Sequence, residues 1–416
     1  MEFKTHILKA LYLFAFLLCS SGLAAFAGAP YEIVHTGVLK TFSDTGEIAP
    51  GPGAYPFRGQ DANYRRNLPS YNDLRNGVIA DNITGLLWAK NMPPKLNYEE
   101  AKNHVNYMNQ TAFGGRRDWR IPSVKELYSL IKFDGEVLGE TYVGKPFIDT
   151  RFFTQPIGNT TIPGERQIDA QNWTSTRYVA RVMQGNGPGF EGQDAFFGVN
   201  FIDGRIKAYP YTSPQGPAKY YLRAVAGNPA YGTNNFIDRQ NGVIHDLNTR
   251  LMWTKYDFGG EAYSWQAALT YCEDLNYGGF NDWHLPNIKE LHSIVDYGRA
   301  PSLIGPLSGP AINPIFGITS IANQKPGVYY PQFPFSWSST THIEGPVKGN
   351  HAAYIAFGEA LGYFSPVPGA APQVLDVHGA GAQRSDTKAH RTSISYFGPQ
   401  GDIIYAGNSG RCVRYG

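Results

Sequence analysis

Two glutamates stand at equivalent places in the chain, each eight residues after an aspartate, so each pair of carboxylates could supply a general acid and a general base. Glu126 follows Ser123 by three residues, and Glu290 follows Asn287 by three. This spacing is typical of a capping box, in which the first side chain accepts a backbone N–H and the glutamate bonds back to the cap amide. We therefore interpret Ser123, Glu126, Asn287 and Glu290 as helix caps and expect no catalytic residues.

Histidines gather with carboxylates in one segment. His378 and His390 lie near Asp376 and Asp386. These side chains could ligate a metal, but no H-x-x-x-H spacing, which places two ligands on one helical face, occurs among them. We expect neither a metal nor a cofactor.

The chain contains an internal duplication with a period near 164 residues. The segment NGVIADNITGLLWAK from Asn76 returns as NGVIHDLNTRLMWTK from Asn241, and RRDWRIPSVKEL from Arg116 returns as FNDWHLPNIKEL from Phe280. Self-similarity at a fixed period defines structural units. The expected divisions are a leader (1–27), a Gly/Pro-rich segment (28–69), a first unit (70–228) and a second unit (235–416).

All seven tryptophans lie in the duplicated units. Three recur after 164 or 165 residues, and the seventh stands where the first unit has Tyr98. Indoles at equal spacing in two copies could stack on sugar rings, but they are more typical of a core. The expected core tryptophans are Trp88, Trp119, Trp173, Trp253, Trp265, Trp283 and Trp337.

Cys272 and Cys412 are the two cysteines that follow the leader. An even number in an exported chain favours a disulfide. The first unit has Val105 and Ala224 at these two positions, so both partners are absent together. Reactive or metal-binding thiols are the alternative, although no other Cys or His stands at ligand spacing.

The first residues predict export. Lys4 and Lys9 precede the apolar run Ala10–Leu18, and small residues lead to a cleavage site after Ala27. Leu18 stands where a lipoprotein signal has a small residue, so we expect no lipid at Cys19. No later stretch approaches the roughly 20 apolar residues of a transmembrane helix. We expect a protein that is secreted, periplasmic or on the outer cell surface.

Charge and composition indicate which partners and which fold class suit this chain. The formal charge of +2 falls to +1 when the leader, with two lysines and one glutamate, is removed. Nucleic acid is an unsuitable partner, because phosphate binding requires a basic surface. Aromatic residues at 14%, with 47 Gly and 29 Pro, favour a loop-rich fold with substantial β structure.

Periodicity predicts the elements of each unit. Short apolar runs at 78–80 and 86–89 flank a turn and predict a β-hairpin. Apolar residues at helical spacing from Tyr98 to Met108, and from Trp265 to Leu275, predict a helix before each capping box. Aromatic strands around Trp173 and Trp337 and a closing strand complete an α+β unit. We expect two tandem domains, each with two helices packed on short antiparallel strands and with long loops.

The order of these motifs resembles the bacterial domain family named after the C-terminal domain of the Legionella collagen-like adhesin. The family pattern is a hairpin ending in L-x-W, a W-x-x-A-x-x-x-C helix, D-W-R-L-P-x-x-K-E-L, W-S-S-T and R-C-V-R. The second unit matches it at Trp253, Trp265–Cys272, Asp282–Leu291, Trp337–Thr340 and Arg411–Arg414. More distantly, the order is similar to the C-type-lectin-like fold and its formylglycine-generating relatives. The resemblance implies adhesion and binding of sulphated sugars, although the collagen-like stalk of the namesake has no counterpart here.

Binding residues are expected where the two units differ most, in the segments 177–193 and 342–391, because loops on a stable scaffold commonly carry recognition. The candidate ligand-binding residues are Arg177, Tyr178, Arg181, His342, His351, Asp376 and His378.

The leading hypothesis is a binding or adhesion protein that recognises extracellular glycans or an envelope protein, and not an enzyme. Two alternatives stay open. One is an oxidase of the formylglycine-generating type, which needs free active-site cysteines. The other is a structural envelope component without a soluble ligand.

Overall fold

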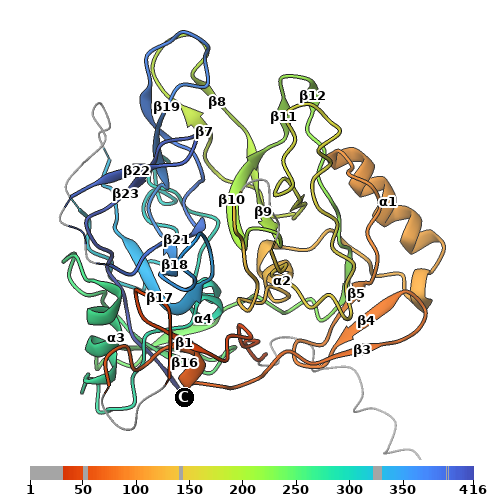
Figure 1. Ribbon diagram of the computed structural model, residues 1–416. Coiled ribbons are helices and arrows are strands. Elements are labelled where there is room, and N and C mark those ends of the chain that lie inside the picture. Colours follow the sequence, from red (N-terminus) through yellow and green to blue (C-terminus); the bar gives the residue numbers. More distant parts are fainter. Residues whose placement is uncertain (1–30, 50–54, 140–143, 322–329, 390, 392) are drawn as a thin grey trace, which may run out of the picture.

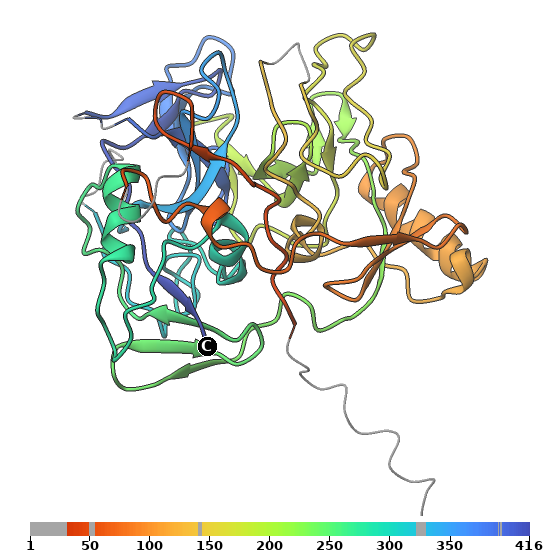
Figure 2. The ribbon, with the colours of Figure 1, turned by 60° about the horizontal axis from the view of Figure 1, so that its bottom comes forward.

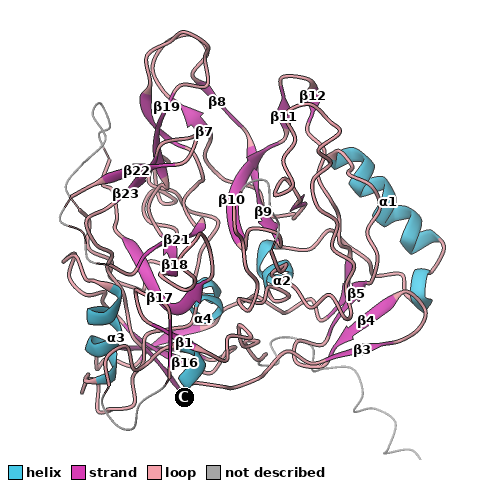
Figure 3. Cartoon of the chain, in the orientation of Figure 1, coloured by secondary structure: helices cyan, strands magenta, loops and turns pink. Residues whose placement is uncertain are grey.

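The computed structural model describes residues 31–49, 55–139, 144–321, 330–389, 391 and 393–416. The leader and Cys19 lie outside these residues. The two units, which we call repeat 1 and repeat 2, lie side by side (Figure 1). Strands and loops dominate, and the described residues contain four α-helices (Figure 3). No described helix combines the length and the apolar character that a bilayer crossing requires.

Each repeat has a four-stranded antiparallel sheet built from its N-terminal hairpin and its closing strand. The orders are β13-β5-β4-β3 and β14-β15-β16-β24. Repeat 1 contributes β3 (Tyr71–Asp73), β4 (Val78–Asp81), β5 (Leu86–Ala89) and β13 (Val225–Gly227). Repeat 2 contributes β14 (Phe236–Asp238), β15 (Val243–Asp246), β16 (Leu251–Thr254) and β24 (Val413–Tyr415).

A six-stranded sheet joins the two repeats, in the order β17-β18-β21-β10-β9-β6. Repeat 1 supplies one half of the sheet, with β6 (Gln171–Asn172), β9 (Ala195–Asn200) and β10 (Arg205–Pro210). Repeat 2 supplies the other half, with β17 (Phe335–His342), β18 (His351–Ala356) and β21 (Gln383–Thr387). The strands β10 and β21 pair antiparallel at the middle, where Ile206 is opposite Gln383. This is the arrangement that a two-fold rotation between the repeats produces.

Equivalent helices begin at the motifs that the sequence marks. They are α1 (Tyr98–Gln110) and α2 (Val124–Tyr128) in repeat 1, and α3 (Trp265–Glu273) and α4 (Ile288–Ser293) in repeat 2. Ser123 caps α2 and Asn287 caps α4, each within a capping box completed by Glu126 or Glu290. The short helices α2 and α4 contact each other and pack on the six-stranded sheet.

A reciprocal pair of hydrogen bonds joins α2 to α4. Lys125 Nζ donates to the carbonyl of Ser293 at 2.7 Å, and Lys289 Nζ donates to the carbonyl of Ser129 at 2.8 Å. The two lysines occupy the same place in the K-E-L motif of their repeats. Each repeat therefore caps the last turn of the other repeat's helix.

All seven tryptophans are buried. Trp119 and Trp173 lie in a cluster of repeat 1, and Trp265, Trp283 and Trp337 in a cluster of repeat 2. The largest cluster, however, contains Trp88 and Trp253 together with residues of both repeats. The two tandem domains expected from the sequence therefore do not have fully separate cores, because the face between the repeats is itself a core.

The predicted disulfide between Cys272 and Cys412 is confirmed, with their Cα atoms 5.5 Å apart. It ties α3 to the residue that precedes β24. In repeat 1 the equivalent residues Val105 and Ala224 are both buried in one hydrophobic cluster.

The two segments expected to be solvated loops contain strands. Segment 177–193 includes β7 (Val182–Gln184) and β8 (Glu191–Gln193). Segment 342–391 begins at the end of β17 and contains β18, β19 (Leu361–Phe364), β20 (Gln373–Asp376) and β21. The expectation fails because runs such as Ala352–Ala356 are buried sheet residues. The other short strands of the two repeats are β11 (Thr212–Ser213), β12 (Gly216–Pro217), β22 (Ser395–Phe397) and β23 (Asp402–Ile404).

The segment before repeat 1 folds across repeat 2. We call residues 31–49 and 55–69 the strap. It contains β1 (Thr41–Phe42), β2 (Glu47–Ile48) and a short 3₁₀ turn at Asp61–Asn63. Figure 2 shows it running over repeat 2 before the chain enters β3. Its contacts include Tyr64 with Glu273 and Arg58 with Asp274.

Candidate functional site

The junction of β10 and β21 sets the orientation of the charged side chains around it. Neighbouring residues of a strand point to opposite faces. Ile206 lies in the buried core and the Gln383 amide accepts a hydrogen bond from Tyr128 of α2, so these side chains face the helices. Arg205, Lys207 and Arg384 therefore point to the other face of the sheet.

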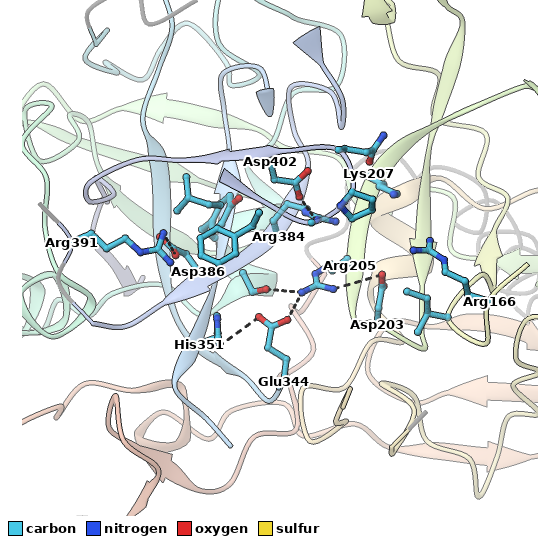
Figure 4. A pocket seen from close by; sticks show the side chains of 18 residues that line it. Arg166, Asp203, Arg205, Lys207, Glu344, His351, Arg384, Asp386, Arg391 and Asp402 are labelled. Carbon is cyan, nitrogen blue, oxygen red and sulfur yellow. Dashed lines mark hydrogen bonds and ion pairs between the residues drawn. The ribbon is translucent and has the colours of Figure 1, made fainter. Parts of the chain in front are cut away.

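A polar cavity of about 490 Å³ opens on that face, between the two repeats (Figure 4). Residues from β10 and the preceding turn line one side, and residues from β18, β21 and the β22–β23 hairpin line the other. Aromatic lining comes from Tyr354 and Phe397. The charged or titratable lining residues are Arg166, Asp203, Arg205, Lys207, Glu344, His351, Arg384, Asp386, Arg391 and Asp402.

Most of these charges are paired across or beside the cavity. Arg205 of repeat 1 bonds Glu344 of repeat 2, which ties the two walls together. Arg384 bonds Asp402, and Arg391 Nη1 lies 3.1 Å from Asp386 Oδ1.

The pairing keeps two of the carboxylates ionised despite their burial. Desolvation disfavours the charged form of Glu344, but Arg205, His342 and His351 together outweigh it and lower the pKa of Glu344 to about 2. Desolvation acts in the same way on Asp402, yet His378 and Arg384 hold its pKa far below the ordinary value.

Burial shifts the pKa values of Asp386 and His378 toward the neutral form of each side chain. Burial raises the pKa of the Asp386 carboxyl to about 6, although Arg391 opposes the shift. Burial lowers the pKa of His378 to about 3, so this ring is neutral at neutral pH.

Lys207 has no such partner. Among the described residues, no carboxylate lies within ion-pair distance of its ammonium, and none accepts a hydrogen bond from it. Its Nζ lies 5.1 Å from the centre of the Tyr209 ring. Burial, assisted by Arg384, lowers the pKa of Lys207 to about 8, so the group is mostly protonated at neutral pH. An ammonium in a polar cavity without its own anion is suited to bind an anionic group of a ligand.

The residues that the sequence nominated for binding divide into three groups. His351 lines the cavity. Arg177 and Arg181 are exposed and each lies 3.4 Å from Asp194, away from the cavity. The other four are buried.

These four buried residues correct the expectation of exposed binding loops. Tyr178 donates a hydrogen bond to Asp376, which joins the repeats in the interior. His342 is 0% exposed and its Nε2 lies 3.0 Å from the Asp203 carbonyl. His378 lies 2.9 Å from Asp402, beneath the cavity wall. They are structural neighbours of the site because the segments that carry them are inner strands and tight connections.

Sequence reasoning missed the cationic residues of the cavity. A signal was present in R-I-K-A at 205–208, where charged and apolar residues alternate as on a half-buried strand. In Q-R-S-D from Gln383, charged residues alternate with uncharged polar ones. The pairing of these two strands, however, joins residues 177 positions apart and could not be read from either alone.

A metal site is not evident in the part of the chain that the structure describes, where no three His, Cys, Asp or Glu side chains form a ligand group. His390, the histidine nominated with His378, lies outside the described residues.

The profile of the Lcl C-terminal domain matches residues 77–226 and again residues 242–367. The chain belongs to the Lcl C-terminal domain family. No match was found among curated proteins or among solved structures. The second Lcl match ends at Val367, before β20. The cavity wall that includes Arg384, Arg391 and Asp402 therefore lies outside it, whereas Lys207 and Arg205 lie within the first match.

Proposed function

We propose that this chain is a secreted or cell-surface binding protein, and that the inter-repeat cavity holds an acidic sugar unit of an extracellular or envelope glycan. The single observation that carries the proposal is Lys207, a cation in a cavity built by both repeats with no carboxylate of the described residues at ion-pair distance. The volume falls in the range of small-ligand sites, roughly 300–1,000 Å³.

The rest of the lining supports a sugar ligand. Arg166 and Arg384 extend the positive wall beside Lys207, and guanidinium groups suit carboxylate or sulfate oxygens. Tyr354 and Phe397 supply aromatic surface for the apolar face of a sugar ring. Ion-paired carboxylates such as Asp402 can accept from hydroxyl groups.

Membership of the Lcl family supports adhesion as the biological role, and the leader-like residues 1–27 support export. A C-type-lectin-like fold is part of the proposal, supported by the bridge between α3 and the last strand. The oxidase alternative requires free thiols, and thiol titration of the unreduced, unfolded mature protein would decide it.

The test is calorimetric titration of the mature protein with an oligogalacturonate and a sulfated oligoglucan, against a neutral oligoglucan of equal length, with and without calcium. We expect the acidic ligands to bind and the neutral one not to bind. Lys207→Met keeps the side-chain stem without its charge and should weaken binding about tenfold, the effect of losing one charge-assisted hydrogen bond. Lys207→Arg should retain most of the affinity.

Lys219→Met is the matched control, because Lys219 is an exposed lysine of the same repeat. Affinity should fall as pH rises through about 8, where free Lys207 loses its proton. Equal binding of acidic and neutral glycans, or unchanged affinity in Lys207→Met, would refute the proposal.

A further inference from the structure

The two repeats present the same corner to their surroundings, where the W-S-S-T motif of repeat 2 and its counterpart in repeat 1 meet the second helix. Thr340 Oγ1 accepts the backbone N–H of Ile288 at 2.9 Å, and Thr176 Oγ1 accepts the N–H of Val124 at 2.9 Å. Each threonine lies 164 residues from the other along the chain. Each hydroxyl therefore keeps its own proton to donate.

In repeat 2 the strap covers this corner. The Thr340 hydroxyl donates to Asp61 Oδ2 at 2.7 Å, and the ring of Tyr64 stacks on His284 with centroids 4.2 Å apart. Asp61 is 1% exposed and also lies 3.1 Å from His35 Nε2. A short polypeptide stretch with an aspartate and, three residues later, a tyrosine thus fills the corner.

In repeat 1 no described segment fills it. The connection from β13 to β14 is short, and the corner opens as a groove of about 460 Å³ between Thr176, the connection and the loop after α4. The Thr176 hydroxyl proton has no acceptor among the described residues. Arg120, at the position equivalent to His284, lines the same groove.

We propose that this groove binds an extended segment of a partner polypeptide that carries an aspartate followed three residues later by an aromatic residue. The aspartate accepts from Thr176 as Asp61 accepts from Thr340. The aromatic ring lies on the planar Arg120 guanidinium as Tyr64 lies on His284, a stacking that arginine supports well.

Arg120 gives the corner a permanent positive charge for an acidic partner, among lining residues that also include Lys125, Glu126 and Asp296. Arg120 stands where repeat 2 has a histidine, and its side chain is 31% exposed although it also bonds Glu126. Apolar surface for the rest of the segment comes from Pro229, Phe236 and Tyr297. The site is separate from the inter-repeat cavity and does not rest on the glycan proposal.

The probe is a labelled synthetic peptide with the sequence of residues 59–65, GQDANYR, added to the mature protein in a fluorescence anisotropy titration. We expect saturable binding of one peptide per chain. Thr176→Val removes the hydroxyl and should weaken binding about tenfold. Thr176→Ser should restore it, and Thr160→Val, the same change at an exposed threonine of repeat 1, should have no effect.

A peptide with asparagine in place of its aspartate should also bind the natural protein about tenfold less tightly. To the Thr176→Val protein the two peptides should bind equally tightly, because the two changes remove the same contact. Three results would each overturn the proposal. They are no binding at millimolar peptide, equal affinity in the Thr176→Val and Thr160→Val variants, and additive losses from the peptide and protein changes. Thermal unfolding of each variant confirms that it is folded.

Discussion

Repeat 1 and repeat 2 share a scaffold but differ in the disulfide and in the segment that covers the scaffold. Repeat 2 has the disulfide between Cys272 and Cys412 and is covered by the strap, whereas repeat 1 has Val105 and Ala224 at the bridge positions and an open corner at Thr176. The extra sheet β20-β19-β23-β22 also belongs to repeat 2.

The comparison separates scaffold from recognition. Residues at equal spacing in both repeats, such as the tryptophans and the capping boxes, are buried or satisfy backbone groups. The cavity draws instead on Lys207 and Arg384, which the pairing of β10 with β21 places at equivalent positions of the two repeats but which differ in their partners, since among the described residues only Arg384 bonds a carboxylate. Duplication thus supplied two similar units, and the binding surfaces arose where the copies meet and where they differ.

The largest effect on stability should follow from replacing the disulfide of repeat 2 by the apolar pair of repeat 1. Cys272→Val with Cys412→Ala copies the repeat 1 residues and opens a loop that spans 140 residues. The chain-entropy model assigns such a loop on the order of 4 to 5 kcal/mol, because the crosslink restricts the unfolded chain. We expect unfolding of the variant at clearly lower urea, followed by tryptophan fluorescence.

The converse change sharpens the comparison. Val105→Cys with Ala224→Cys should form a second disulfide, seen as the loss of two thiols in mass spectrometry. It should raise the urea concentration at the midpoint of unfolding. Reductant should lower the midpoint of the natural protein but leave that of the Cys272→Val, Cys412→Ala variant unchanged. Equal midpoints for that variant and the natural protein would show that the bridge does not stabilise repeat 2.

Much of the scaffold was predictable because it depends on local signals. The capping residues Ser123 and Asn287 mark the helix starts, and the paired absence of Cys272 and Cys412 from repeat 1 identified the bridge. These features require only neighbouring residues or a comparison of two copies.

The site was largely not predictable, because it depends on how the repeats meet. His351, predicted as a binding residue, does line the cavity, but Lys207 and Arg384 come together only through the pairing of β10 with β21. His342 and His378 were misplaced because their segments fold into the interior, where a histidine is a buried neighbour of Asp203 and Asp402 rather than a ligand contact. Polar residue type alone does not distinguish an inner strand from an exposed loop.

A smaller effect should follow from removing either lysine of the reciprocal pair between α2 and α4. Lys289→Met leaves the carbonyls of His35 and Ser129 without their donor in a site where the lysine is 4% exposed. An unsatisfied buried carbonyl costs roughly 1 to 3 kcal/mol. Lys125→Met should destabilise less, because its site is half-buried and water can reach the freed groups. Urea unfolding measures both, with Lys219→Met as the control, and an equal loss at the two positions would contradict the difference in burial.

The smallest effect, for a change of one pH unit, is the pH dependence that Lys289 imposes. Burial lowers the pKa of Lys289 to about 7, although Asp81 and Asp61 oppose the shift, whereas an unfolded lysine titrates near 10.5. Between these values the unfolded chain holds a proton that the folded chain has released, so raising the pH favours folding. The contribution is constant below pH 7 and grows above it by on the order of 1 kcal/mol per pH unit.

The measurement is the difference in unfolding free energy between the natural protein and Lys289→Met at pH 6, 7, 8 and 9, because groups common to both proteins cancel in that difference. It should be flat from pH 6 to 7 and then rise in favour of the natural protein. Lys125→Met should show the rise beginning near pH 8, since burial lowers the pKa of Lys125 to about 8. A difference that stays constant across the range would mean that Lys289 keeps its proton in the folded state, and that the clamp between the repeats is an ammonium rather than an amine.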